Sequence, residues 1–368
     1  MATSLPLLNL PPTVSEQVLQ KLTFPDLFDL SQCSKRTFNL IKASIKKRCN
    51  IMVTIDSTSE IKITNENLGS VGSAAWMFYE ARDPARVDLE DPRTYKVDGM
   101  RMKFCRSNET NQFARGNAQF GCLSSHSTQE FIKFCEHILT LFNATVFSLD
   151  ILSRKKGCLE QLLSIEAFRN CNDLDIDMGK LSHEEMRKIL TGFPNTEEFC
   201  LMSDTKKNFI CDQPVKFQDI TAYSSSWINA QFLRNMEFKQ ASLNDSSLTN
   251  KDLNSYLKHW LEGSNSQMEY LCVSWPVSEE ANEKLPSSDW DLSKIVEGIP
   301  TLPGAAKRQG IERYYCMRTN GVPYENGLDL KRESDGMLAT VVLFKDHLNG
   351  ESFLFEVWQV PDPNVVVG

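Results

Sequence analysis

The chain has 368 residues, of which 41% are hydrophobic and 24% are charged, and its formal net charge is −8. This composition is typical of a globular protein that is long enough to bury one or more cores, and it argues against wholesale disorder. The acidic balance argues against a general nucleic-acid binder, because lysine and arginine make the contacts to phosphate. We therefore expect no nucleic-acid partner.

No stretch approaches eighteen uninterrupted apolar residues, so no membrane span and no membrane partner are expected. The apolar N-terminal stretch lacks a basic flank and is interrupted by Pro6, Pro11 and Pro12, which argues against a secretory signal. Eleven cysteines are scattered without a CxxC pair, a spacing that does not fit structural zinc but fits thiols in a reducing compartment. We expect a cytoplasmic or nuclear location.

Residues 11–47 predict three short helices. Pro12 suits the first helical turn, and apolar residues then recur at helical spacing: Val14, Val18, Leu19 and Leu22, then Leu27, Phe28 and Leu30, then Phe38, Leu40, Ile41 and Ile45. Helices of about ten residues are marginal alone, and a unit of about 45 residues has too little core to be stable by itself. The unit must therefore pack against the rest of the chain or be completed by another protein. The short helices and small core favour the second alternative.

Residues 51–125 predict a β-rich connecting region. Apolar residues alternate with polar ones at Ile51, Val53 and Ile55, and again at Met100, Met102 and Phe104. Residues 65–95 are rich in turn formers and charge and predict no definite element.

From 126 to 275 short strands alternate with amphipathic helices, which include 158–168, 183–190, 227–235 and 250–261. Spacings of 27 residues from Phe147 to Leu174 and 25 from Leu174 to Phe199 indicate a degenerate leucine-rich-repeat-like solenoid, with a parallel concave sheet and outer helices. Residues 276–368 predict a β-rich C-terminal part. The expected class is α+β or α/β: a small N-terminal helical module over 1–50, then these three regions.

The segment Asp173 to Glu184 imitates an EF-hand calcium loop, because acids occupy its positions 1, 3, 5 and 12. Met178 stands where the loop needs glycine, and the alternation of aspartate with apolar residues predicts a half-buried strand instead. The stretch 116–123 lacks the Lys-[Ser/Thr] of a phosphate loop. The five histidines show no ligand spacing. We predict no catalytic, cofactor-binding or metal-binding residue, and no cofactor.

The first 48 residues resemble an F-box of the kind found in a large nematode family. The resemblance rests on Leu8-x-Leu10-Pro11, on Val18-Leu19-x-x-Leu22, on the spacing from Pro25 through Leu27 to Leu30-Ser31, and on Cys33-Ser34-Lys35-Arg36. A second module of that family, the type 2 F-box-associated domain, is similar to three later stretches. These are SSSWINAQFL, SLTNKDLNSYLKHWLEGSNSQMEYL, and the tail DLKRESDGMLATVVLF with FEVW.

The resemblance implies a non-catalytic substrate receptor of a Skp–cullin–F-box ubiquitin ligase. The F-box would bind a Skp-type adaptor and through it cullin and RING subunits, and the remainder would present an unidentified protein substrate. The implied adaptor-binding residues are Leu8, Leu10, Pro11, Val14, Val18, Leu19, Leu22, Leu27, Leu30, Ser31 and Cys33. Two alternatives are a scaffold that binds the adaptor without ubiquitination, and a small-ligand or calcium-dependent enzyme centred on Asp173–Glu184.

Overall fold

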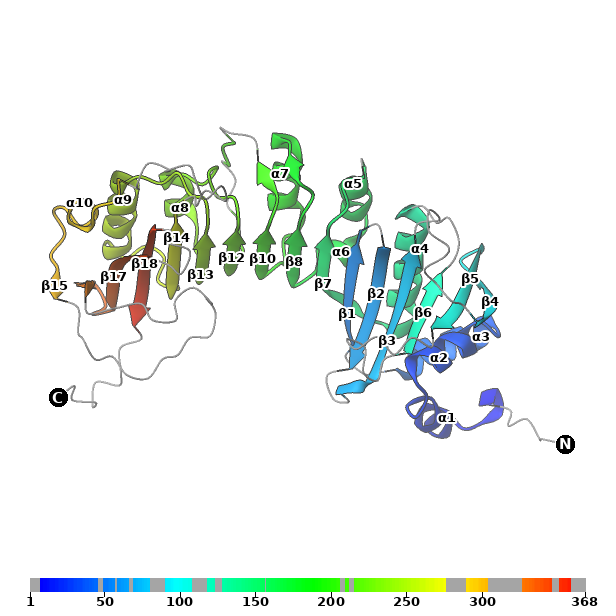
Figure 1. The fold of residues 1–368 in the computed structure, drawn as a ribbon. Coiled ribbons are helices and arrows are strands. Elements are labelled where there is room, and N and C mark those ends of the chain that lie inside the picture. The colour runs from blue at the N-terminus through cyan, green and yellow to red at the C-terminus, as the bar shows by residue number, and fades with distance from the viewer. Residues whose placement is uncertain are drawn as a thin grey trace. The chain divides into compact units, whose positions relative to one another are not determined.

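The computed structural model describes residues 7–45, 49–56, 58–65, 69–79, 90–107, 118–122, 128–155, 157–205, 209–211, 215–275, 289–303, 326–345 and 351–358 (Figure 1). The chain forms two compact units. Unit 1 comprises residues 1–178 and 192–196, and unit 2 comprises 179–191 and 197–368. Both units combine helices with strands, which confirms the α+β class.

Unit 1 begins with the helical module, which contains a 3-10 turn and three α-helices: η1 (Leu7–Asn9), α1 (Pro12–Leu19), α2 (Phe24–Ser31) and α3 (Lys35–Ser44). The prediction of three helices is confirmed. Pro12 occupies the first helical position, where a backbone N–H is not needed. Thr23 caps α2 and Ser34 caps α3, each by accepting a hydrogen bond from a backbone N–H three residues on.

Eight strands of unit 1 lie in the order β8-β7-β1-β2-β3-β6-β5-β4. Their bounds are β1 (Cys49–Ile55), β2 (Thr58–Asn65), β3 (Gly69–Tyr79), β4 (Glu90–Val97), β5 (Met100–Ser107), β6 (Ala118–Cys122), β7 (Thr145–Ile151) and β8 (Asp173–Ile176). β1, β2 and β3 pair antiparallel, whereas β1, β7 and β8 run parallel. β3 and the start of β4 lie in the region where the sequence predicted no element.

Three helices follow the β-rich region of unit 1: α4 (Thr128–Phe142), α5 (Cys158–Leu163) and α6 (Glu166–Arg169). α4 has an apolar face on which Phe131, Phe134 and Ile138 are buried. The single helix expected over 158–168 was wrong, because the helix is interrupted at Ser164. The Ser164 hydroxyl donates to the carbonyl of Gln161 at 2.6 Å, and Ile165 has an extended backbone.

The acidic stretch that resembled a calcium loop begins with strand β8. Leu174 and Ile176 are fully buried, whereas Asp173 and Asp175 alternate with them at intermediate exposure. This is the half-buried strand that the sequence predicted. Gly179, with φ of 72°, turns the chain after the strand.

The strands of unit 2 have the order β15-β16-β17-β18-β14-β13-β12-β10. β10 (Glu198–Leu201), β12 (Asp219–Ala222), β13 (Gln240–Leu243) and β14 (Tyr270–Ser274) run parallel. β15 (Leu302–Pro303), β16 (Leu328–Lys331), β17 (Leu338–Lys345) and β18 (Glu351–Trp358) form an antiparallel set that joins β14 through β18. The short strands β9 (Lys180–Leu181) and β11 (Asp204–Thr205) pair separately.

The helices of unit 2 are α7 (His183–Gly192), α8 (Ala230–Asn235), α9 (Asn250–Leu261) and α10 (Leu292–Ile295). α9 has the bounds that its sequence predicted. α8 begins three residues later than expected, because the Asn229 side chain accepts from the N–H of Phe232 and so caps the helix there. Strand β12 was not predicted. Among the described residues, no helix is long and apolar enough to cross a membrane.

Candidate protein-docking site

The residues that the resemblance assigned to adaptor binding divide into three groups by exposure. Three are exposed: Pro11, Val14 and Cys33. Five are half-buried: Leu8, Leu10, Val18, Leu22 and Leu30. The remaining three, Leu19, Leu27 and Ser31, are at most 5% exposed and belong to the core. Only the first two groups present side chains at the surface of the chain.

Helix α1 is oriented by its own buried side. Leu19 is fully buried and Ser15 is 2% exposed, so this pair, four residues apart, fixes the inward face. The Ser15 hydroxyl donates to the carbonyl of Pro12 at 3.0 Å. Val14 and Val18 are also four residues apart and therefore form a second stripe beside the first. Val14 remains 40% exposed, although burial of a valine is favourable by about 1.5–3 kcal/mol.

Aromatic rings hold the second helix of the module, α2, against the rest of unit 1. The Phe28 ring centroid lies 5.6 Å from that of Trp76 on β3, 5.2 Å from that of Tyr95 on β4 and 5.7 Å from that of Phe134 on α4. Phe24 packs edge-on against Phe142 at 5.3 Å. Edge-to-face pairs contribute about 0.5–1.5 kcal/mol beyond their buried area. The module thus shares the core of unit 1.

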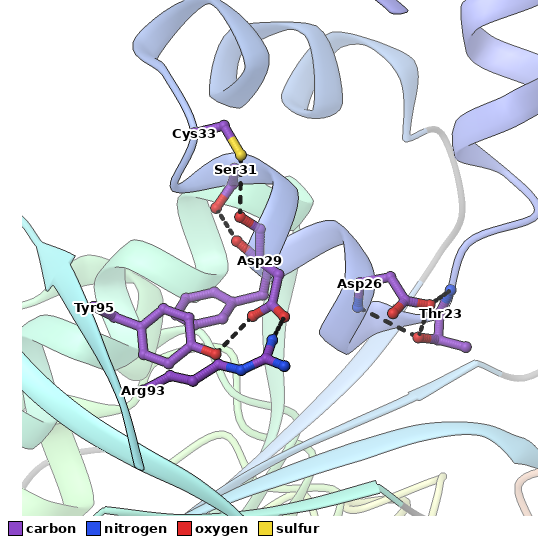
Figure 2. Close-up of polar contacts among 8 residues, drawn as sticks. Thr23, Asp26, Asp29, Ser31, Cys33, Arg93 and Tyr95 are labelled. Carbon is purple, nitrogen blue, oxygen red and sulfur yellow. Dashed lines mark hydrogen bonds and ion pairs between the residues drawn. The ribbon is translucent and has the colours of Figure 1, made fainter. Parts of the chain in front are cut away.

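A polar cluster around Asp29 also holds α2 in place (Figure 2). Asp29 accepts from the Tyr95 hydroxyl at 2.8 Å and pairs with Arg93 at 3.2 Å. Burial raises the pKa of Tyr95 to about 12, with a further contribution from the Asp29 carboxylate. Tyr95 therefore stays protonated and continues to donate to Asp29 throughout the physiological range.

His137 of α4 lies beneath the helical module. It is 8% exposed, its ring centroid is 5.2 Å from that of Phe38, and its Nδ1 is 3.4 Å from a carboxylate oxygen of Asp98. Gln32 approaches Nε2 at 3.5 Å. Burial lowers the pKa of His137, and the Asp98 charge opposes that shift. The imidazole is therefore neutral at pH 7.

The sequence left open whether the module packs on its own chain or on another protein. The structure shows that its inner side packs on the rest of unit 1, and that its outer side keeps Pro11, Val14 and the half-buried leucines at the surface.

Sequence reasoning placed Phe28 in the second helix but did not identify it as the residue that anchors the module. Phe24 was not singled out either. Two aromatic residues four positions apart in a short helix were the available signal.

The described part of the chain offers little for catalysis. It contains no group of three or more His, Cys, Asp or Glu residues placed to hold a metal ion. Burial raises the pKa of the Cys158 and Cys171 thiols to about 11, and that of Cys135 well above its usual value. These thiols are core residues rather than nucleophiles. Cys105, Cys122 and Cys316 lie outside the described side chains.

Two family models match the chain. Residues 7–49 match the F-box domain, and residues 208–273 match the F-box associated family. The first range covers α1, α2 and α3, and the second extends from before β12 into β14. The chain therefore contains an F-box domain and an F-box associated region, as the resemblance implied. Proteins with these domains are typically non-catalytic adaptor subunits, and the two matches indicate no catalytic family.

The relatives come from Caenorhabditis elegans. Uncharacterized protein F59B2.9 is 21% identical over 357 residues, which are 96% of this chain and 78% of that protein. Uncharacterized protein F59B2.8 is 22% identical over 366 residues, which are 97% of this chain and 78% of that protein. Skn-1 dependent zygotic transcript 15 protein is 21% identical over 306 residues, which are 79% of this chain and 82% of that protein. No solved structure matches the chain.

Proposed function

We propose that this chain is the substrate-recognition subunit of a Skp–cullin–F-box ubiquitin ligase. F-box domains bind Skp1 adaptors within such complexes. The chain would bind a Skp-type adaptor through its helical module, and through it cullin and RING subunits. The remainder would hold a target protein for ubiquitination and degradation, in the cytoplasm or the nucleus. Its contribution is proximity, because holding the target raises the effective concentration of its lysines near the activated ubiquitin.

One observation carries the proposal: the outer side of the helical module keeps apolar side chains at the surface while its inner side is fixed to unit 1. Val14 is 40% exposed, and Leu10, Val18 and Leu22 are half-buried. Contiguous apolar side chains at a surface mark sites of protein association. We assign adaptor contact to these residues with Leu8, Pro11, Leu30 and Cys33. Leu19, Leu27 and Ser31 support the site from the core.

The parallel strands β10, β12, β13 and β14, with helices between them, support a repeat architecture over 126–275. We propose that this region is a degenerate leucine-rich-repeat-like array. In this proposal the array belongs to the substrate-binding part of the subunit.

The test is co-purification of a Skp-type adaptor with variants of the full chain. Val14→Asp, alone and with Leu10→Asp and Pro11→Asp, should remove the adaptor, because a carboxylate would be buried without a partner in the interface. Ile210→Asp is the matched control, since Ile210 is 63% exposed and belongs to unit 2. It should leave adaptor recovery unchanged.

Unchanged recovery of the adaptor with the Val14 variant would show that the docking face is misassigned. Thermal unfolding of each variant excludes a folding defect. Probing the same preparations for cullin separates a ligase subunit from a scaffold. Adaptor without cullin, under conditions where another F-box protein recovers both, would refute the ligase role.

A further inference from the structure

The sheet of unit 2 has two chemically different faces along its parallel strands. Alternate residues on one face are buried, among them Phe199, Ile220, Ala241 and Leu271, each at most 2% exposed. Leu271 pairs with Phe355, whose ring meets Tyr256 and Trp260 of α9. This is therefore the helix-covered face. The side chains between these positions point to the opposite face.

On that opposite face the amino ends of the strands are acidic. Glu198 on β10 lies beside Asp219 on β12 in the strand register, and these two carboxylates belong to this face. Glu197 and Glu269 precede the strands and do not share this row, but they lie close enough to act on Asp219. Lys239 opposes their effect, and its ammonium lies 3.6 Å from Glu269. Among the described residues that act on Asp219, carboxylates therefore outnumber ammonium groups.

One carboxylate oxygen of Asp219 lacks a hydrogen-bond donor in the described part of the chain. This oxygen, Oδ1, is shielded from solvent. Burial and the Glu198 charge raise the pKa of Asp219. A buried carboxylate oxygen without a donor is costly, so a cation arriving from another molecule would relieve this cost.

At the carboxyl ends of the same two strands the face becomes apolar. Met202 is 40% exposed and Tyr223 is 49% exposed. The N–H of Tyr223 donates to the carbonyl of Leu201 at 2.8 Å, so the register continues and places Met202 beside Tyr223. Tyrosine and methionine are enriched where proteins bind other proteins.

Between these ends the face carries the small side chains of Cys200, Thr221 and Ser242, which share one register row. An extended chain can approach such a row closely. Asp219 and Tyr223 are four residues apart along one strand direction, which corresponds to about 13 Å. An extended ligand covers the same distance in about four residues.

We propose that this surface, the acidic strand face formed by Glu198, Asp219, Met202 and Tyr223 with the small residues between them, binds an extended protein segment of defined chemistry. The segment carries a lysine or arginine that pairs with Asp219 and Glu198. About four residues away it carries a bulky apolar side chain that packs on Met202 and Tyr223. The assignment of this segment as the ligase substrate rests on the proposed function, whereas the binding itself does not require the adaptor.

The test is a selection from a displayed library of random peptides of about twelve residues on the immobilised full chain. The selected peptides should be enriched in basic residues followed or preceded by an apolar residue about four positions away. A synthetic peptide with the selected sequence should then bind roughly tenfold more weakly to Asp219→Asn/Glu198→Gln and to Tyr223→Ser. Its affinity should also fall with added salt.

The matched control is Glu262→Gln, which removes one exposed carboxylate at the end of α9 and should not change peptide affinity. Unaltered thermal unfolding of the Asp219 and Tyr223 variants shows that they are folded. Selection of no peptides, selection without a basic preference, or equal affinity for the wild type and the double variant would each overturn the proposal.

The two proposals fail separately. Val14→Asp should lose the adaptor and keep peptide binding, whereas Asp219→Asn/Glu198→Gln should bind the peptide more weakly and keep the adaptor. Peptide binding without any adaptor would remove the ligase role and leave the acidic strand face as a binding site. Adaptor recovery without any selected peptide would keep the ligase role and remove the acidic strand face as a binding site.

Discussion

The hydroxyl of Tyr95 and the guanidinium of Arg93 both contact Asp29, but in different surroundings. The Tyr95 side chain is 8% exposed, and its bond to Asp29 is 2.8 Å long. Arg93 is 68% exposed, and its contact with Asp29 is 3.2 Å long. Hydrogen bonds to charged groups contribute about 1.5–3 kcal/mol, whereas exposed ion pairs contribute about 0–1 kcal/mol.

We therefore predict that Tyr95→Phe lowers the free energy of unfolding of unit 1 by about 1 kcal/mol, after allowance for the partial exposure of Asp29. Arg93→Met should lower it by less than about 0.5 kcal/mol. Urea titration of the two variants and the wild type measures both changes. A larger effect at Arg93 than at Tyr95 would mean that the ion pair, and not the phenol, fixes α2.

His137 gives unit 1 a pH dependence whose sign follows from burial. Because the pKa of His137 is lower in the folded chain than the ordinary value of about 6.5, the unfolded chain binds more protons in the interval between the two values. Stability is complete above about pH 6.5 and falls as the pH drops below it, by at most about 1.4 kcal/mol per pH unit.

We predict that His137→Gln reduces the loss of thermal stability of the wild type between pH 7 and pH 5.5. The substitution keeps a polar side chain near Gln32 and removes the titrating group. Melting temperatures of both proteins across this range measure the difference. Carboxylates, including those whose pKa is raised by burial, are the same in both proteins and therefore do not account for it. Parallel curves for the two proteins would contradict a role for His137.

At the scale of single elements, a threonine–aspartate cap precedes one helix in each unit. Thr23 donates to Asp26 at 2.6 Å ahead of α2, and Thr249 donates to Asp252 at 2.7 Å ahead of α9. In both, the threonine hydroxyl also accepts from the backbone N–H of the aspartate. A cap of this kind contributes about 0.5–2 kcal/mol.

Thr23→Ala and Thr249→Ala should therefore each cost about 1 kcal/mol, in unit 1 and unit 2 respectively. Only Thr23→Ala should increase hydrogen exchange in α2 and reduce adaptor recovery, because α2 supports the docking surface. Hydrogen-exchange mass spectrometry locates the effect of each change. Loss of the adaptor with Thr249→Ala would show that the docking surface depends on unit 2.

Elements with strong local signals were predictable from the sequence. The helix expected over 183–190 is present and begins after a Ser182–Glu185 cap with a hydroxyl-to-carboxylate distance of 2.6 Å, and α9 has the predicted bounds. Elements whose limits depend on tertiary contacts were not predictable. The strand Asp219–Ala222 has only two apolar residues, and its neighbours on the sheet define it.

At the scale of the whole molecule, the apolar positions of the helical module were predictable, but the direction in which each of them points was not. The apolar positions of the helical module could be read from their helical spacing. Which of them face outward is set by Phe24 and Phe28, whose partners Phe142 and Trp76 lie far along the chain. No local sequence pattern indicates such contacts. The sequence therefore could not show that Leu19 and Leu27 are buried while Val14 and Val18 reach the surface.

This shared core predicts that the helical module does not fold by itself. A fragment of residues 7–49 would expose the rings of Phe24 and Phe28, and its helices of 8, 8 and 10 residues are too short to persist in water. A fragment of residues 1–196 retains the partners of both rings and should unfold cooperatively. Circular dichroism during heating distinguishes the two. The short fragment should gain helix when a Skp-type adaptor is added, because the adaptor would supply apolar surface in place of unit 1. A cooperative transition of residues 7–49 alone would show that the module is stable without the aromatic contacts that join it to unit 1.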